Sequence, residues 1–131
     1  MVIDTSAILA ILFGEPEAEA MVRAIAETDT RLVGTPTLVE ASAVIQARKG
    51  PAGDLALDAL LRRLSIETVP FTDTAATLAR LAYGRVGKGI GSPPVLNYVD
   101  CLAYATAMSL RESLLFKGGD FHETDVTAVT Y

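Results

Sequence analysis

The sequence predicts an α/β fold, a layered sandwich in which helices flank a mainly parallel β-sheet. Short apolar segments typical of strands alternate four or five times with longer segments of helical periodicity, and this alternation favours a parallel sheet. The chain has 131 residues, half of them hydrophobic, which is enough to bury a self-sufficient core. We therefore expect one domain over residues 1–131.

The first half of the chain offers two strands and four helices. Thr5 and Ser6 can cap the first helix, and Pro16 can start the second. Pro36 and Gly50 suit the beginning and the end of the third helix. The expected elements are, in order, the strand Met1–Asp4, the helices Ala7–Gly14 and Pro16–Thr28, the strand Arg31–Gly34, and the helices Thr35–Lys49 and Ala52–Leu64.

The second half continues the alternation. Thr72 can cap its first helix and Gly84 can close it. Its second helix is almost uncharged, which predicts that it is largely buried. The expected elements are the strand Ile66–Phe71, the helix Asp73–Tyr83, the loop Arg85–Pro94, the helix Asn97–Leu110, the strand Ser113–Phe116, a turn at Gly118-Gly119, and the strand Val126–Tyr131.

Composition excludes several classes of protein. The only cysteine, Cys101, excludes an intrachain disulfide, and with one histidine in the chain a Cys/His zinc site is excluded as well. No uncharged run approaches the roughly 20 residues of a membrane span, and no signal peptide opens the chain. We therefore expect a cytoplasmic protein with no membrane partner. The net charge of −5 argues against nucleic acid unless the acids are gathered to hold a metal ion.

Three carboxylates stand in apolar segments with few bases nearby, namely Asp4, Glu40 and Asp100. A lone buried carboxylate costs several kcal/mol unless it is paired or bound to metal. Asp120 follows a predicted strand by one tight turn, so it reaches the same edge of a parallel sheet as Asp4. Oxygen ligands without histidine favour Mg²⁺ or Mn²⁺ over zinc.

Each acid taken alone also has an ordinary explanation. Asp4 suits a helix cap, and Glu40 suits a partly exposed helix position. Asp125 is a rival to Asp120 for the fourth position, although its place before a predicted strand suits a turn cap better. The acids favour a metal site only when they are taken together.

The segments that carry these acids resemble the PIN-domain ribonucleases, and most closely the VapC toxins of bacterial toxin–antitoxin pairs. The resemblance covers residue 2 to about residue 127. Its most specific part is the combination of two segments in the second half of the chain. It is carried by Asp4-Thr5-Ser6, Glu40, Gly87-Lys88-Gly89, Leu96–Cys101 and Leu115–Phe121.

The resemblance implies a three-layer sandwich and metal-dependent endonucleolytic cleavage of RNA, with Mg²⁺ or Mn²⁺ as cofactor. It assigns catalysis to Asp4, Glu40, Asp100 and Asp120, with Asp4 and Asp100 as the most direct metal ligands. We assign contacts with the RNA to Ser6, Arg85, Lys88 and Asn97, although Ser6 could donate to a carboxylate in place of a phosphate. The resemblance further implies a homodimer and a VapB-type antitoxin that covers apolar surface and inserts a basic side chain among the acids.

Two other classes of protein share parts of this pattern. A receiver domain also gathers acids at strand ends, but it needs an acidic pair near the start, and Asp4 has no acidic neighbour. A PIN-fold protein that only binds partners is the stronger alternative. Its support is Val99, where family members often carry glycine, whereas the complete set of four acids argues against it.

Overall fold

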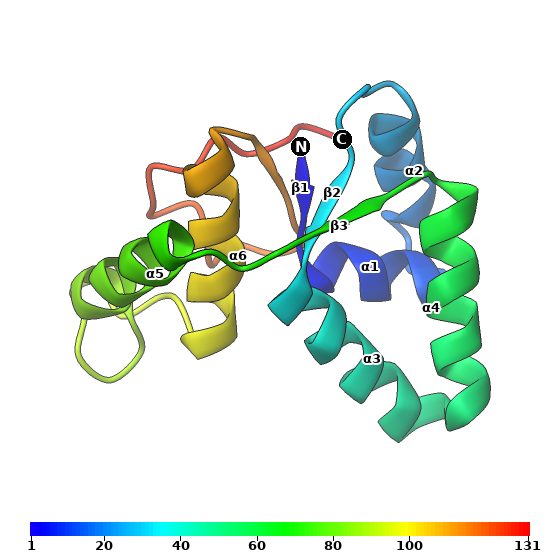
Figure 1. Cartoon of the computed structure of the whole chain (residues 1–131), viewed down its shortest axis with the longest axis horizontal. Coiled ribbons are helices and arrows are strands. Elements are labelled where there is room, and N and C mark those ends of the chain that lie inside the picture. The colour runs from blue at the N-terminus through cyan, green and yellow to red at the C-terminus, as the bar shows by residue number, and fades with distance from the viewer.

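The fold is built around a four-stranded, fully parallel sheet with the strand order β3-β2-β1-β4 (Figure 1). The computed structural model describes all residues 1–131. The strands are β1 Val2–Ile3, β2 Leu32–Gly34, β3 Glu67–Val69 and β4 Leu114–Leu115. The helices are α1 Thr5–Leu12, α2 Ala18–Ala26, α3 Thr35–Lys49, α4 Pro51–Arg63, α5 Asp73–Val86 and α6 Tyr98–Leu110. The predicted α/β fold with a parallel sheet is confirmed.

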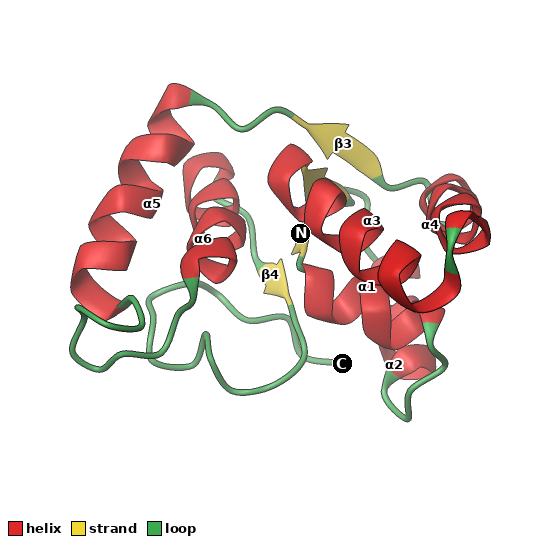
Figure 2. Ribbon diagram, turned by 90° about the horizontal axis from the view of Figure 1, so that it is seen from below, coloured by secondary structure: helices red, strands yellow, loops and turns green.

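The sheet buries both of its faces, because successive side chains of a strand point to opposite sides. Val2 and Leu114 belong to the hydrophobic core shared with α5 and α6. Ile3 and Leu115 belong to the second core, which is shared with α1, α2 and α4. Figure 2 shows α5 and α6 on one side of the strands and α1 to α4 on the other. The structure is thus the predicted three-layer sandwich, and none of its helices is long and apolar enough to cross a membrane.

Local signals set several helix ends where the sequence predicts them. Helix α3 spans Thr35–Lys49, with Pro36 in its first turn and Gly50 in the left-handed region at φ +64° after its last turn. Thr72 caps α5 by accepting a hydrogen bond from the backbone N–H of Ala75. These ends depend on one or two residues each, which is why they can be found in the sequence.

Two predicted boundaries are wrong. Helix α1 begins at Thr5, with Asp4 as its cap, and not at Ala7. Helix α5 continues through Gly84 to Val86, so Arg85 lies in a helix and not in the following loop. Burial of Ala79 and Ala82 against α6 outweighs the cost of about 1 kcal/mol for an internal glycine.

The predicted last strand, Val126–Tyr131, is also wrong. This segment makes a single parallel bridge, between Leu114 and Ala128. Strand β4 is only two residues long, so it offers too few backbone groups to pair a full neighbouring strand.

Replacing either of two helical glycines, Gly53 and Gly84, by alanine should change the stability of the protein in opposite directions. A Cβ on Gly53 of α4 would lie 2.9 Å from the Ile45 carbonyl oxygen of α3, whereas a Cβ on Gly84 would meet nothing within 4 Å. We expect Gly53→Ala to destabilise the protein by about 1 kcal/mol or more through overpacking. Gly84→Ala should stabilise it by about 0.5–1 kcal/mol through helix propensity. Urea denaturation measures both, and a destabilising Gly84→Ala would contradict the position of Gly84 inside α5.

Candidate active site

Four acids from distant parts of the chain meet at the carboxyl edge of the sheet. Asp4 follows the central strand β1, and Glu40 lies in the second turn of α3, which follows β2. Asp100 lies in the first turn of α6, and Asp120 follows β4 after a glycine turn. Parallel strands bring their carboxyl ends to one edge, which accounts for Asp4, Glu40 and Asp120, whereas Asp100 comes from α6, which contacts β1.

Asp4 is buried, with 5% of its surface exposed. Its Oδ2 accepts hydrogen bonds from the Ser6 backbone N–H at 2.9 Å and from Ser6 Oγ at 2.6 Å. Ser6 Oγ accepts in turn from the Lys117 backbone N–H at 2.9 Å. The single hydroxyl proton of Ser6 is therefore committed to Asp4, and Ser6 orients that carboxylate, which is one of the two roles that the sequence offers for it.

Burial and repulsion by neighbouring acids raise the pKa values of Asp4 and Asp100. Burial raises the pKa of Asp4, and repulsion by Glu40 adds to this, while the hydrogen bonds from Ser6 oppose it. Burial also raises the pKa of Asp100, with repulsion by Asp4 and Asp120 acting in the same direction. The bond from Asn97 and the charge of Lys88 lower it. Acids that repel one another in this way form one electrostatic cluster.

Glu40 is held by a residue that the sequence analysis missed. The hydroxyl of Thr5, which is buried, donates a hydrogen bond to Glu40 Oε2. Thr5 directly follows Asp4, so one short segment supports two of the four acids. The place of Thr5 between Asp4 and Ser6 was the available signal, but only the packing of α1 against α3 identifies its partner.

Asp100 and Asn97 form a capping box at the start of α6. The Asn97 backbone N–H donates to Asp100 Oδ2 at 2.7 Å, and Asn97 Oδ1 accepts from the backbone N–H groups of Val99 and Asp100. Asn97 therefore acts as the helix cap, where we expected a contact with RNA. The capping box also fixes the orientation of Asp100.

The two predicted basic contacts have different surroundings. Lys88 Nζ lies 3.4 Å from Asp120 Oδ2, and both side chains are about half exposed. Arg85 instead pairs with Asp125 at 3.0 Å and contacts the hydroxyl of Tyr104, so its guanidinium is occupied. The hydrogen bond from Tyr104 and the pairing with Arg85 lower the pKa of Asp125. Asp125 is therefore paired outside the acid cluster, whereas Asp120 is one of the acids that raise the pKa of Asp100.

The acids offer oxygen ligands that suit a divalent cation. All the hydrogen bonds to Asp4 and Asp100 reach Oδ2, so each keeps a free Oδ1. No three Asp, Glu, His or Cys side chains are close enough together to form a complete metal cage. This fits a hard cation such as Mg²⁺, which is held by one or two carboxylates and keeps several water ligands.

Comparison with known proteins identifies a family. The family model of the PIN domain matches residues 1–126. The chain is 46% identical over 129 residues to the ribonuclease VapC of Mycolicibacterium smegmatis, covering 98% of this chain and 99% of that protein. Among solved structures it is similar to the sarcin–ricin loop cleaving toxin VapC20 of Mycobacterium tuberculosis, with a TM-score of 0.75, 18% identity and 98% and 97% coverage. A toxin–antitoxin complex from Klebsiella pneumoniae matches with a TM-score of 0.71, 16% identity and 99% and 97% coverage.

The raised pKa values of Asp4 and Asp100 predict a pH dependence. The folded protein binds these protons more tightly than the unfolded chain, so their contribution to stability is full below the unfolded pKa and is lost as pH rises through the folded pKa. Asp4→Asn keeps an oxygen acceptor for Ser6 but carries no charge. We expect it to exceed the wild type in stability by about 1 kcal/mol at neutral pH in EDTA, with a smaller difference in acid.

Urea denaturation at several pH values measures this difference. Asp29→Asn is the matched control, because Asp29 is exposed and makes no ion pair. It should leave the pH dependence unchanged. A wild-type protein that is more stable than Asp4→Asn at neutral pH would show that the Asp4 carboxylate is compensated by the chain itself.

Proposed function

Because this chain belongs to the PIN-domain family and is closely similar to a VapC ribonuclease, we propose that it is a metal-dependent endoribonuclease. We further propose that it is the toxin of a VapBC-type toxin–antitoxin pair. The observation that supports catalysis best is the charge coupling of Asp4 with Glu40 and of Asp100 with Asp4 and Asp120. Carboxyl groups such as Asp4 and Asp100, whose pKa values are raised by burial and by neighbouring acids, are typical of functional sites.

In this proposal Asp4 and Asp100 would hold a Mg²⁺ or Mn²⁺ ion, and Glu40 and Asp120 would complete the acidic site. A bound divalent cation supplies Lewis-acid chemistry, lowering the pKa of its water and neutralising charge on the scissile phosphate. Ser6 and Thr5 hold Asp4 and Glu40 in place, and the capping box does the same for Asp100. This preorganisation lets the acids act without first rearranging.

Lys88 is the proposed phosphate contact. It lies beside Asp120 on an exposed loop between two glycines, so its ammonium can exchange Asp120 for an RNA phosphate.

The alternative of a PIN-fold protein that only binds partners finds no further support. Val99 donates its backbone N–H to Asn97 within an intact capping box, so its bulk does not displace Asp100 from the start of α6.

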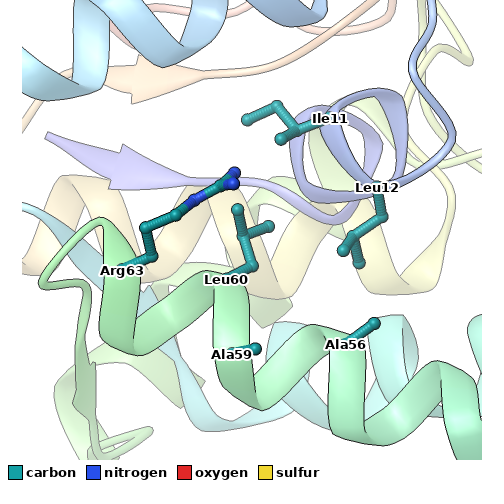
Figure 3. A pocket seen from close by; sticks show the side chains of 6 residues that line it. All are labelled: Ile11, Leu12, Ala56, Ala59, Leu60 and Arg63. Atoms are coloured by element: carbon teal, nitrogen blue, oxygen red, sulfur yellow. The ribbon is translucent and has the colours of Figure 1, made fainter.

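The proposed antitoxin partner suits an apolar groove between α1 and α4. One part of the groove has a volume of about 350 Å³ and carries Arg63 at its rim (Figure 3). A neighbouring hollow of about 300 Å³ shares Leu12 and Ala56 with it. We propose that an apolar antitoxin segment with an acidic residue opposite Arg63 binds here. The first part is lined by Ile11, Leu12, Ala56, Ala59, Leu60 and Arg63.

Cleavage is tested with the purified protein and structured RNA. We expect endonucleolytic cleavage only with added Mg²⁺ or Mn²⁺, and a loss of at least about 100-fold in Asp4→Asn, because the amide removes a charge that the cation needs. Circular dichroism should show that the variant is folded. Asp125→Asn is the matched control that should keep cleaving. Full activity of Asp4→Asn, or cleavage in EDTA, would contradict the assignment.

The groove is tested by blocking it with a long charged side chain. Ala59 is exposed in the groove, so Ala59→Arg should fold normally and weaken binding of the cognate antitoxin by about tenfold or more. Leu55→Arg is the matched control on the same helix, because Leu55 is 69% exposed and does not line the groove. Calorimetric titration measures both affinities. Equal affinities for the two variants would exclude this groove.

A further inference from the structure

A second pocket lies on α6, the helix that also carries Asp100, and has no part in the proposed cleavage chemistry. It has a volume of about 300 Å³ and is formed where α5 packs against α6. Its residues on α6 are spaced i, i+3 and i+4, so they share one face of the helix. Asp100 lies in the same first turn of α6, but it is two residues away from both Tyr98 and Leu102, so it points away from the face that lines the pocket. The lining residues are Ala79, Arg80, Tyr83, Tyr98, Cys101 and Leu102.

We propose that this pocket binds one nucleobase of the RNA strand whose phosphate contacts Lys88. This inference rests on the proposed ribonuclease function and adds to it the side chains that grip the strand. A nucleobase is a flat aromatic ring with polar edges, so it needs an aromatic surface and a few donors or acceptors at its rim.

The pocket offers the aromatic surface. Tyr98 is 68% exposed, so much of its ring is open to a ligand. The Tyr83 hydroxyl donates to the Lys88 carbonyl oxygen at 3.1 Å, which restrains that ring and links the pocket to the loop of the proposed phosphate contact. Base stacking on such rings tolerates any base, because every base has a π-face.

The pocket also offers an unpaired cation. Arg80 forms none of the ion pairs or side-chain hydrogen bonds within the chain. Its planar guanidinium presents donors in a geometry that matches acceptors on a base edge or a phosphate. An unpaired guanidinium beside an exposed aromatic ring suits a nucleobase, which has a π-face and acceptors on its edge.

The charge of the protein requires contacts of this kind. The net charge is −5, and the acid cluster repels the phosphates that approach it. Binding through basic side chains alone is therefore weak, in contrast to most proteins that bind nucleic acid. Stacking in the pocket supplies affinity that does not come from pairing a basic side chain with a phosphate.

The test measures RNA binding in an Asp4→Asn background, which keeps the strand intact. The probe is a short fluorescein-labelled single-stranded RNA of random sequence, and anisotropy gives its Kd in Mg²⁺. Tyr98→Ala should weaken binding by about tenfold or more, whereas Tyr98→Phe, which keeps the ring, should stay within about twofold. Tyr131→Ala removes another exposed aromatic ring outside the pocket and should change nothing.

The same RNA with abasic positions separates stacking from phosphate contacts. Its affinity for the protein with intact Tyr98 should be about tenfold lower than that of the unmodified RNA. The Tyr98→Ala variant should bind this abasic RNA with the same affinity as the protein with intact Tyr98. An unchanged Kd in Tyr98→Ala overturns the inference. So does a loss of binding that accompanies conversion of a dimer to a monomer in sedimentation, because the pocket would then belong to a subunit interface.

Failure of the inference and failure of the proposed function have different signatures. A wild-type protein that cleaves RNA while Tyr98→Ala binds it unchanged refutes the nucleobase pocket alone. A wild-type protein that neither cleaves nor binds RNA with any divalent cation refutes both. The oligomeric state, measured in the same samples, also tests the homodimer that the family resemblance implies.

Discussion

A carboxylate buried at the end of the central strand is the constraint on which the rest of this structure depends. Asp4 follows β1, which pairs with β2 on one side and β4 on the other, and almost none of its surface reaches solvent. A charge in such a place must be compensated by hydrogen bonds or by a cation. The chain supplies two hydrogen bonds, both to Oδ2 and both from Ser6.

The parallel sheet makes a shared acidic site possible by bringing separate segments to the same edge. Each acid is then tied down by its own neighbours: Asp4 by Ser6, Glu40 by Thr5, and Asp100 by Asn97. Such supports oppose the mutual repulsion of the carboxylates and hold them before any ligand arrives. The remaining repulsion lowers the stability of the protein, and the two hydrophobic cores on the faces of the sheet compensate for it.

The pocket beside α6 and the groove between α1 and α4 suit different kinds of partner. Beside α6, exposed Tyr98 and unpaired Arg80 suit a flexible nucleic acid strand. Between α1 and α4, the groove with Arg63 is lined mainly by aliphatic side chains and suits a protein segment (Figure 3). Both features lie outside the acid cluster, so binding and catalysis can change independently of each other.

The sequence by itself determined the alternation of strands and helices and the bounds of α3, and it singled out Asp4, Glu40, Asp100 and Asp120 as candidate site residues. These follow from local signals: prolines and glycines at helix ends, and charges in apolar segments. Only the tertiary structure decided that α5 passes through Gly84, that no strand forms after Val126, and that Asp125 pairs away from the cluster.

Only the tertiary structure shows that Ser6 and Asn97 support Asp4 and Asp100 through hydrogen bonds. The physical reason is the range of the interactions. A helix cap is chosen by residues within one turn of each other. The partner of a hydroxyl or a guanidinium depends instead on which distant segment the fold brings within hydrogen-bonding distance, as with Lys117 for Ser6 and Asp125 for Arg85.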